Sequence, residues 1–505
     1  MPPSTIGCLV PSRSQIRVWI IRKLSGASLG SLQNTLTRME RSQTKMRTVA
    51  EQIGAYVADL KFEDLGEEVI DYTKRILLDS LACAYGGADS EPARLTRETA
   101  SELGGVDHAT IWADGTRSSA PLAALANGVA IRYQDYNDVY FGPAWTAHPS
   151  DNIATLFAVA EWKKSSGAEL LLAMVAAYEV QMRFSDLPVA RNLWHSGWHH
   201  TAACSYAAAA GVSKLLELDA ERTTHAITLA GARSNTFAEI RHGDIPMDKA
   251  LSAPIVASQS VVYALLAQRG FTGCATLLEG RYGFRTAVAG GVDVEPLVPE
   301  KGDFRILKIG LKPYPVEGMT PAMVQAAIEL KEEHRIDRGE VQAVRILAHE
   351  EAVTKPSWDD RKLAPTTKET ADHSFHYCVA VALVAGTVTS EQFSDDWLRN
   401  PVVAALMGKM RLEAKPEFTA LFKQGARPAA VEITTARGTF YREVLYPRGD
   451  PRSPMTWQHI DRKLREQAEK RIGAAAVQRI VERTARMEQE TDLRAFSNML
   501  AGKNR

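Results

Sequence analysis

The amino-acid sequence predicts a mainly α-helical protein with a smaller α+β domain in its second half. Between residue 46 and about residue 290, apolar residues recur at helical spacing, and several stretches are apolar nearly all round. From residue 303, strand-like alternation is mixed with helix, and residues 456–500 return to charged amphipathic helix. The chain has 505 residues and is 45% apolar, which is enough for more than one hydrophobic core.

The first 45 residues are set apart from the rest by their composition. They carry seven Lys or Arg and one acid, and they are rich in serine. Such a leader is typical of a mitochondrial transit peptide, which would place the mature protein in the mitochondrial matrix. The alternative is that translation starts at Met46, which would leave the protein in the cytoplasm. In either case the folded protein is expected to begin near Met46.

The helical part, residues 46–302, contains clear start and stop signals. Residues 62–87 have acids in the first turns and two glycines at the end. Asp151 is a candidate N-cap for the next apolar stretch. Three further stretches, at 167–184, 201–219 and 251–273, are rich in Ala, Ser and Gly, which permits close packing of buried helices.

Residues 303–453 are expected to form the α+β domain, and residues 454–505 the C-terminal helices. DFRIL at 303–307 is interpreted as a short strand, and residues 339–349 alternate as a strand does. Residues 429–449 resemble a hairpin that turns at Arg437-Gly438. Between these strands, residues 373–388 are typical of a buried helix.

Bulk composition excludes some classes of function. Lys plus Arg and Asp plus Glu number 60 each, so the basic excess of a nucleic-acid binder is absent. The five cysteines are scattered without CxxC spacing, which indicates free thiols in a reducing compartment. No run of about 18 uncharged apolar residues occurs, so no transmembrane helix is expected.

Five segments carry more polar chemistry than their apolar surroundings require. They are 135–152 with Asp135, Asp138 and His148; 195–201 with three histidines; 238–254 with Lys249; 311–321 with Lys312 and Glu317; and 371–378 with His373 and Tyr377. Taken singly, these residues suit helix caps, solvated lysines and connecting loops. Together they favour a pocket for a polycarboxylate, in which lysines pair with carboxylates while His, Asp and Tyr move protons. The histidines before the helix at 201 should have a lowered pKa because of the helix dipole.

Other chemistries lack their sequence motifs. There is no GxGxxG between a strand and a helix, no GxxxxGK[ST] and no HExxH. The histidines have no compact ligand spacing, so we expect no metal site.

The polar segments, together with ILLDSLACAYGG at 76–87, resemble the MmgE/PrpD family in order and spacing over about residues 46–490. The quoted pieces are DYND and HPSDN, GWHHT, PMDKALSAP, LKPYPVEG and DHSFHYCVAVAL. The family includes 2-methylcitrate dehydratase, cis-aconitate decarboxylase and iminodisuccinate epimerase. The resemblance implies a large helical domain built from the N-terminal half and the last helices, with an α+β lid domain inserted before them. It also implies a homodimer that works without a metal or an organic cofactor.

The resemblance further implies roles for individual residues. The implied catalytic residues are Asp135, His148, His199 and Tyr377, and the implied substrate-binding residues are Lys249, Lys312, Asp138 and Tyr140. Either His148 or His199 would serve in proton transfer. The implied reaction is elimination of water from 2-methylcitrate or a similar polycarboxylate. The alternatives are decarboxylation of the cis-aconitate type, cofactor-free epimerisation of a dicarboxylate, and a catalytically silent protein that keeps only a binding pocket.

The sequence departs from the family pattern at two places. The first motif commonly reads DxxDT, and Val139 stands at the Thr position, so that Tyr140 or Tyr136 would have to supply the missing hydroxyl. In the lid loop, Gly318 and Met319 stand where a His is common. Both changes bear on the identity of the substrate rather than on the fold.

Overall fold

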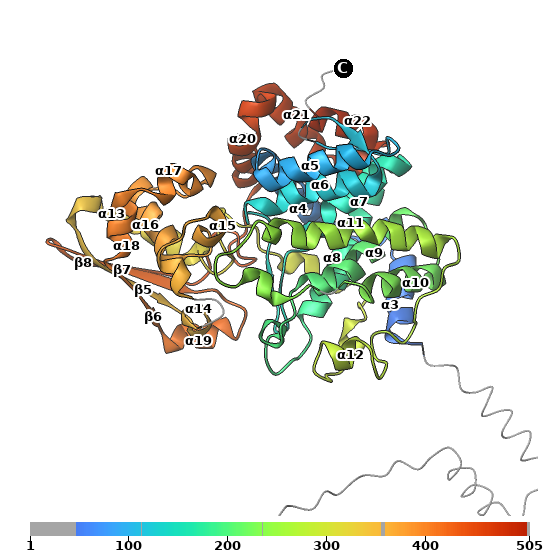
Figure 1. Ribbon diagram of the computed structural model, residues 1–505, viewed down its shortest axis with the longest axis horizontal. Coiled ribbons are helices and arrows are strands. Elements are labelled where there is room, and N and C mark those ends of the chain that lie inside the picture. Colours follow the sequence, from blue (N-terminus) through green and yellow to red (C-terminus); the bar gives the residue numbers. More distant parts are fainter. Residues whose placement is uncertain (1–46, 113, 235, 355–358, 502–505) are drawn as a thin grey trace, which may run out of the picture. The chain divides into compact units, whose positions relative to one another are not determined.

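The computed structural model describes residues 47–112, 114–234, 236–354 and 359–501, and it shows a mainly α-helical fold with two domains (Figure 1). The predicted fold class is confirmed. The leader, and with it the question of a transit peptide, lies outside the described residues.

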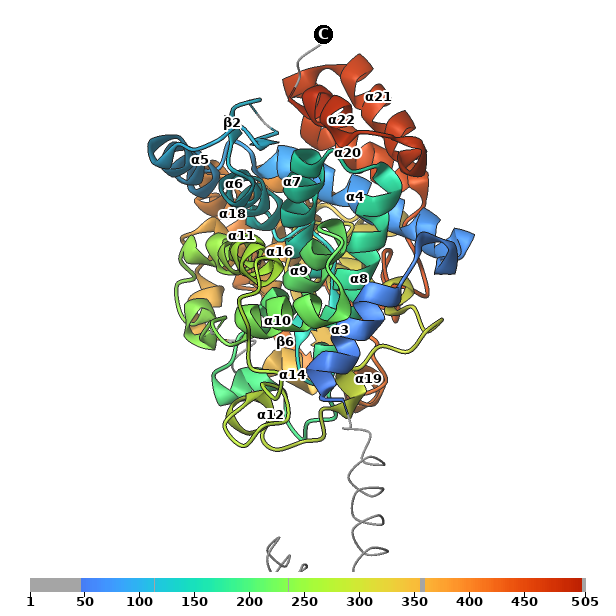
Figure 2. The same cartoon turned by 90° about the vertical axis from the view of Figure 1, so that its right-hand side faces the viewer.

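The helices of the first part enclose one large hydrophobic core. Their bounds are α3 Val49–Asp59, α4 Glu67–Gly87, α5 Glu91–Leu103, α6 Ala120–Tyr133, α7 Ile153–Lys163, α8 Gly167–Ser185, α9 Thr201–Leu215, α10 Ala220–Gly231, α11 Asp248–Gln268 and α12 Phe284–Ala287. Helix α9 lies among α7, α8, α10 and α11 (Figure 2), which explains why its sequence lacks a polar face. Small residues allow this packing: a Cβ atom at Gly87 of α4 would lie 2.0 Å from the carbonyl oxygen of Ala130 in α6.

Short elements connect these helices. They are the strands β1 Ala109–Thr110, β2 Arg117–Ser118, β3 Tyr140–Phe141 and β4 Thr146–Ala147, and the 3-10 helices η1 Phe62–Asp64, η2 Pro149–Asn152, η3 Leu193–Ser196, η4 Ala238–Arg241, η5 Glu295–Leu297 and η6 Arg305–Lys308. The predicted strand at 303–307 is wrong, because η6 forms there and the backbone of Arg305 and Ile306 donates to the buried carboxylate of Glu179. The predicted N-cap at Asp151 is also wrong: Asp151 lies within η2, and Asn152 precedes α7.

The lid has a four-stranded sheet and its own hydrophobic core. Its strands are β5 Val341–Ala348, β6 Met410–Ala414, β7 Ala429–Thr435 and β8 Gly438–Val444, in the spatial order β6-β5-β7-β8, with β5 and β6 parallel and the other pairs antiparallel. The predicted strand at 339–349 and the predicted hairpin are confirmed, whereas β6 was not anticipated. The two longest lid helices pack together, and one of them, α13, covers β7 and β8 (Figure 1).

The helices of the lid have the following bounds: α13 Pro321–His334, α14 Glu350–Val353, α15 Lys368–Ala371, α16 Phe375–Ala385, α17 Asp395–Leu398, α18 Pro401–Met407 and α19 Pro416–Phe422, with η7 Arg338–Glu340, η8 Asp360–Leu363 and η9 Ser390–Phe393. Ser374 caps α16 by accepting from the backbone N–H of Tyr377, and Gly386 ends it with a φ of 73°.

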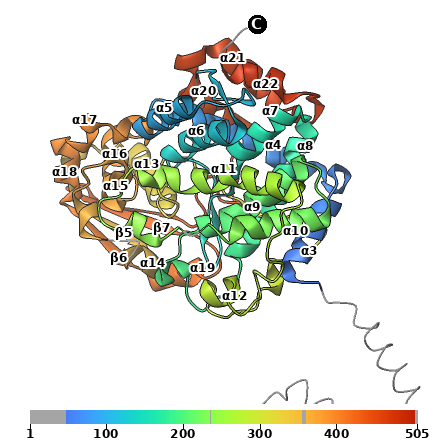
Figure 3. The ribbon, with the colours of Figure 1, turned by 45° about the vertical axis from the view of Figure 1, so that its right-hand side comes forward.

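The chain then returns to the first core. Helices α20 Trp457–Ile472, α21 Ala474–Thr484 and α22 Leu493–Leu500, with η10 Met487–Gln489, pack beside α4 and α7 (Figure 3). Their buried residues, from Met455 to Leu500, belong to the same core cluster as those of α3 to α9. One of these helices also reaches the polar centre of the protein: Lys463 of α20 pairs with Asp79 at 2.7 Å and donates to the carbonyl of Tyr136 at 2.7 Å.

Helix α11 is long and apolar enough to cross a membrane by length and composition alone. In the structure 56% of its most apolar window is buried, against α6, α9 and α10. This is typical of a core helix in a protein without a membrane span. That the chain has no such span stays a prediction.

Candidate active site

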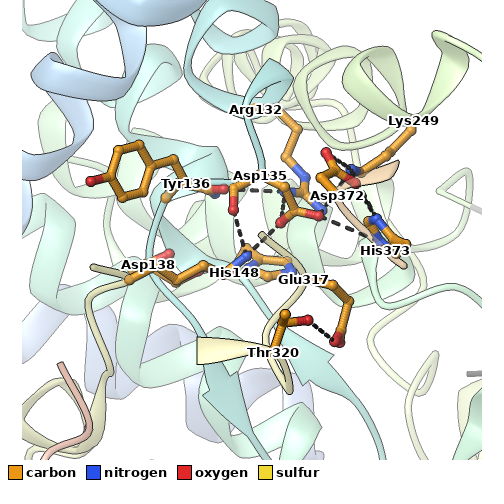
Figure 4. A network of polar contacts seen from close by, with 12 residues as sticks. Arg132, Asp135, Tyr136, Asp138, His148, Lys249, Glu317, Thr320, Asp372 and His373 are labelled. Atoms are coloured by element: carbon orange, nitrogen blue, oxygen red, sulfur yellow. Dashed lines mark hydrogen bonds and ion pairs between the residues drawn. The ribbon is translucent and has the colours of Figure 1, made fainter. Parts of the chain in front are cut away.

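The polar segments meet around Asp135, directly after the end of α6 (Figure 4). Asp135 has a φ of 52°, which is uncommon for a residue with a side chain and often marks a functional site. The guanidinium of Arg132, one turn earlier, donates to the Asp135 carboxylate at 3.0 Å and to Asn137 at 3.1 Å. These bonds hold the turn that brings Asp135 into the interior, where 1% of it is exposed.

Asp135 pairs with two lysines that the sequence analysis selected. Lys312 lies 2.5 Å from Oδ1 and also donates to the Asp135 carbonyl at 2.8 Å, while Lys249 lies 2.9 Å from Oδ2. Burial alone would raise the pKa of Asp135, but Lys249, Lys312 and Arg132 together hold it well below its usual value. Asp135 is therefore a fixed negative charge at the centre of a cationic cluster.

Lys249 also links the helical domain to the lid. It begins α11 and lies 3.1 Å from Asp372, in the turn between α15 and α16. Asp372 further pairs with Lys368 at 2.6 Å and contacts Nδ1 of His373. Burial lowers the pKa of Lys249 to about 8, although Asp135 and Asp372 oppose the shift. Lys249 is thus buried, rather than solvated, and titrates within reach of neutral pH.

His373 completes this side of the network (Figure 4). Its Nε2 lies 3.5 Å from Asp135, and burial together with Lys249 lowers its pKa to about 3. Oxygen and nitrogen atoms of Asp135, Asp372 and His373 lie close enough together to be ligands of one metal ion. The ammonium of Lys249 contacts both carboxylates, so in this arrangement a lysine provides their positive charge.

His148 lies in the same segment as Asp135 and has a defined tautomer. Its Nδ1 lies 2.6 Å from the carbonyl oxygen of Asp138, which can only accept, so Nδ1 carries the proton and Nε2 keeps its lone pair. Burial, reinforced by Arg132, lowers the pKa of His148 well below the usual value. His148 is therefore a neutral imidazole that can accept a proton.

The GWHHT histidines are both buried, and the second one makes the ring contact with His148. The rings of His148 and His200 lie 5.2 Å apart, edge to face, and His200 lies 3.9 Å from Asp151. The ring of His199 lies 4.1 Å from that of His200 at a tilt of 37°, and its Nδ1 contacts the hydroxyl of Thr201. Burial is the largest cause of the lowered pKa of both histidines, followed by nearby positive groups. The pKa of both histidines is thus lowered, as predicted, with loss of hydration as the largest cause.

Two arginines that the sequence analysis did not select face this region. The Nε and Nη2 atoms of Arg132 and of Arg241 are buried and have no hydrogen-bond partner within the described ranges. Burial lowers the pKa of Arg241 to about 10, and Arg241 acts electrostatically on His199 and His200. Arg132 is the single charged residue of α6, which is a signal in the sequence. Arg241 lies in η4, outside any periodic pattern.

Three of the predicted site residues bond away from this cluster. The Asp138 carboxylate accepts from Ser150 and from Tyr178, the latter at 2.8 Å, so it closes the 135–152 segment and thereby places His148. The hydroxyl of Tyr140 donates to Asp186 at 2.6 Å. The hydroxyl of Tyr377 donates to the carbonyl of Gln392 at 2.6 Å, inside the lid core.

Val139, which stands where the family pattern commonly has Thr, makes its contacts outside the cluster around Asp135. Val139 pairs its backbone with Gly310, and its side chain packs against Gly318, where a Cβ atom would lie 3.3 Å from Cγ2. Val139 and Gly318 therefore line the border between the two domains.

Among the described residues, five cationic side chains gather around two carboxylates that are held ionised. The cations are Arg132, Arg241, Lys249, Lys312 and Lys368, and the carboxylates are Asp135 and Asp372. Burial raises the pKa of Asp151 to about 7 and that of Asp138 to about 6, so at neutral pH Asp151 is about half protonated and Asp138 is mostly ionised. The fold and this site define a two-domain helical protein with a buried, net cationic centre suited to an anionic small molecule.

The comparisons with known proteins agree with this description. Residues 51–297 match the MmgE/PrpD N-terminal domain and residues 314–489 match the MmgE/PrpD C-terminal domain, so the chain belongs to the MmgE/PrpD family. It is 26% identical to "2-methylcitrate dehydratase, mitochondrial" of Yarrowia lipolytica, over 79% of this chain and 80% of that one. It is 28% identical to a 2-methylcitrate dehydratase of Cupriavidus necator, over 76% and 82%. The human cis-aconitate decarboxylase is 24% identical, over 90% and 95%.

Proposed function

We propose that this protein is a lyase that eliminates water from 2-methylcitrate or a similar polycarboxylate, without a metal. The observation that carries the proposal is the set of buried guanidinium atoms on Arg132 and Arg241 that have no hydrogen-bond partner among the described residues, beside neutral histidines. Buried donors of this kind are costly unless a ligand satisfies them, and carboxylates match their geometry. Relatives named 2-methylcitrate dehydratase support the same chemistry.

The proposed elimination uses one base and one acid. His148 takes the proton from the carbon next to a substrate carboxylate, because its Nε2 lone pair is free. Asp151, whose pKa burial raises to about 7, donates a proton to the leaving hydroxide. The cations lower the free energy of the transition state by pairing with negative charge that builds up on the carboxylate. The products are a C=C double bond and water; His148 then releases its proton to solvent and Asp151 takes one up, which restores the starting state.

The second candidate is a decarboxylase of the cis-aconitate type, favoured by the human relative that covers 90% of the chain. Here the C–C bond to a carboxylate breaks, carbon dioxide leaves, and the carbanion is protonated at carbon. Epimerisation, the third reaction, would break and remake only a C–H bond.

One turnover panel separates these reactions. The full chain is incubated with 2-methylcitrate, citrate and cis-aconitate, and new conjugated double bonds are followed by absorbance together with carbon dioxide release. A double bond without carbon dioxide supports dehydration, and carbon dioxide supports decarboxylation. Deuterium uptake from solvent into unchanged substrate supports epimerisation, and no turnover at all would defeat the enzyme proposal. Activity lost to EDTA and restored by a metal ion would defeat metal independence.

We also propose a homodimer and, for residues 1–45, either removal as a mitochondrial transit peptide or a start at Met46. The Yarrowia relative, which is named as a mitochondrial enzyme, supports the first choice for the leader. Light scattering of the purified chain and N-terminal sequencing of the mature protein test the two points separately.

A further inference from the structure

A second cationic pocket lies at the border between the helical domain and the lid. Its volume is about 360 Å³, within the range of small-molecule sites. The helical domain contributes Val139 to Phe141 and Lys308 to Pro313. The lid and the connection to α20 contribute Gln424 to Arg427 and Pro447 to Arg452.

Arg427 is the buried charge of this pocket. It is 8% exposed, and its guanidinium carbon lies 3.7 Å from the ring centre of Phe141 and 4.1 Å from that of Phe422. One nitrogen, Nη1, donates to the carbonyls of Ala426 and Phe422, while Nε is buried without a partner in the part of the chain that the structure describes. The two rings and two carbonyls position the guanidinium, which forms no ion pair among the described residues.

Two exposed cations line the pocket together with Arg427, and like Arg427 they form no ion pair among the described residues. Within the described residues, Lys308 and Arg448 make no ion pair, whereas Arg452 is paired with Asp450 at 2.7 Å and Lys312 with Asp135. After these pairs are set aside, Arg427, Arg448 and Lys308 leave three positive charges in one pocket that form no ion pair among the described residues. The field in such a pocket attracts anions.

We propose that this border pocket binds a small oxyanion, a phosphate or a carboxylate, held by Arg427, Arg448 and Lys308. The anion would satisfy the buried Nε of Arg427 and bridge the lid to the helical domain, since Lys308 belongs to the latter and Arg427 and Arg448 do not. The site is separate from the cluster around Asp135, because Lys312 turns its ammonium away to Asp135. It does not depend on which reaction the protein catalyses.

Binding of inorganic phosphate and of succinate to the full chain, measured by calorimetry at low salt, tests the site. The anion that binds more tightly identifies the chemical class of the ligand. In Arg427→Gln we expect the affinity for that anion to fall by about tenfold or more, as for loss of a charge-assisted hydrogen bond. Because Arg427 is buried, the double variant Lys308→Gln/Arg448→Gln serves as a second probe at exposed positions, with thermal unfolding to confirm folding.

Two control variants test whether a loss of anion affinity is specific to the border pocket. Arg411→Gln removes one exposed positive charge from the edge strand β6, away from the pocket lining, and should bind the anion as the wild type does. Lys249→Met disrupts the catalytic cluster and should leave unchanged the anion binding that Arg427→Gln weakens. The proposal is overturned if neither anion binds, if the pocket variants bind as the wild type does, or if Lys249→Met abolishes binding.

Discussion

Replacing Lys249 by Met tests the central cluster most directly. Lys249 is 1% exposed and contacts both Asp135 and Asp372, so its removal takes one cation from two buried carboxylates. Methionine keeps most of the side-chain volume, so that the lost charge rather than a cavity dominates the effect.

The expected loss in the free energy of unfolding depends on the cations that still pair with Asp135 and Asp372. Breaking a buried ion pair by removing one partner costs about 3–5 kcal/mol. Here Asp135 keeps Lys312 at 2.5 Å and Arg132 at 3.0 Å, and Asp372 keeps Lys368 at 2.6 Å. We therefore expect the free energy of unfolding to fall by about 2–3 kcal/mol, below the full cost of an unpaired buried charge. On the candidate substrates, kcat/KM should fall by about 10- to 150-fold or more, which corresponds to one lost hydrogen bond to a charged group.

Urea unfolding at pH 7 and steady-state kinetics measure the two effects on the same preparations. Lys74→Met is the matched control, because Lys74 is also buried and paired, with Glu488 at 3.0 Å, but lies between α4 and the C-terminal segment. It should lose stability while keeping the wild-type kcat/KM. Wild-type kinetics in Lys249→Met, or an equal loss of kcat/KM in Lys74→Met, would refute the role assigned to Lys249.

Three further changes probe other parts of the site. Arg241→Met should raise KM by about tenfold or more with little loss of stability, because the buried Nε and Nη2 atoms bond to nothing in the described protein; an unchanged KM would remove Arg241 from the binding site. Asp151→Asn should gain stability over the wild type as pH rises from about 4 to 7, because over this range the folded wild type holds a proton that the unfolded chain has lost. Above pH 7 the raised pKa of Asp151 destabilises the wild type by about 4 kcal/mol. A constant stability difference between the two proteins from pH 4 to 8, in urea titrations, would contradict the raised pKa. Tyr377→Phe should cost about 1 kcal/mol for the bond to Gln392 and leave kcat unchanged; a large loss of kcat in a folded protein would restore the catalytic role implied by the family resemblance.

The fold could be predicted to a large extent because its signals are local. Apolar stretches such as 201–215 have no polar side, which only a buried helix tolerates, and the 429–444 hairpin has alternation and a Gly turn. The strand β6 was not predicted because it is a five-residue edge strand that pairs with β5 across more than sixty residues of sequence. The error at 303–307 has a similar origin, since the side chain that orders η6 is Glu179, far away in the chain.

The sequence indicated which segments contribute to the candidate site, but not which of their side chains contact one another. Asp135, His148, Lys249 and Lys312 were predicted because polar residues are conspicuous next to apolar helices; the two lysines contact Asp135, and the roles of all four stay predictions. Which of them would meet could not be deduced, because Lys249 reaches Asp372 through the packing of the lid on α11. Asp372 was not selected from the sequence, although its neighbour His373 was.

The placement of Val139 changes how its substitution bears on substrate choice. From the sequence alone, a missing hydroxyl next to Asp135 suggests a lost contact to a carboxylate. In the structure the side chain of Val139 packs against Gly318, and both residues line the border pocket with Arg427. The two departures from the family pattern thus fall on one surface, where the lid meets the helical domain, and not on the buried cations that would hold a polycarboxylate. If substrate choice differs from that of the relatives, its cause should be sought in how this border closes.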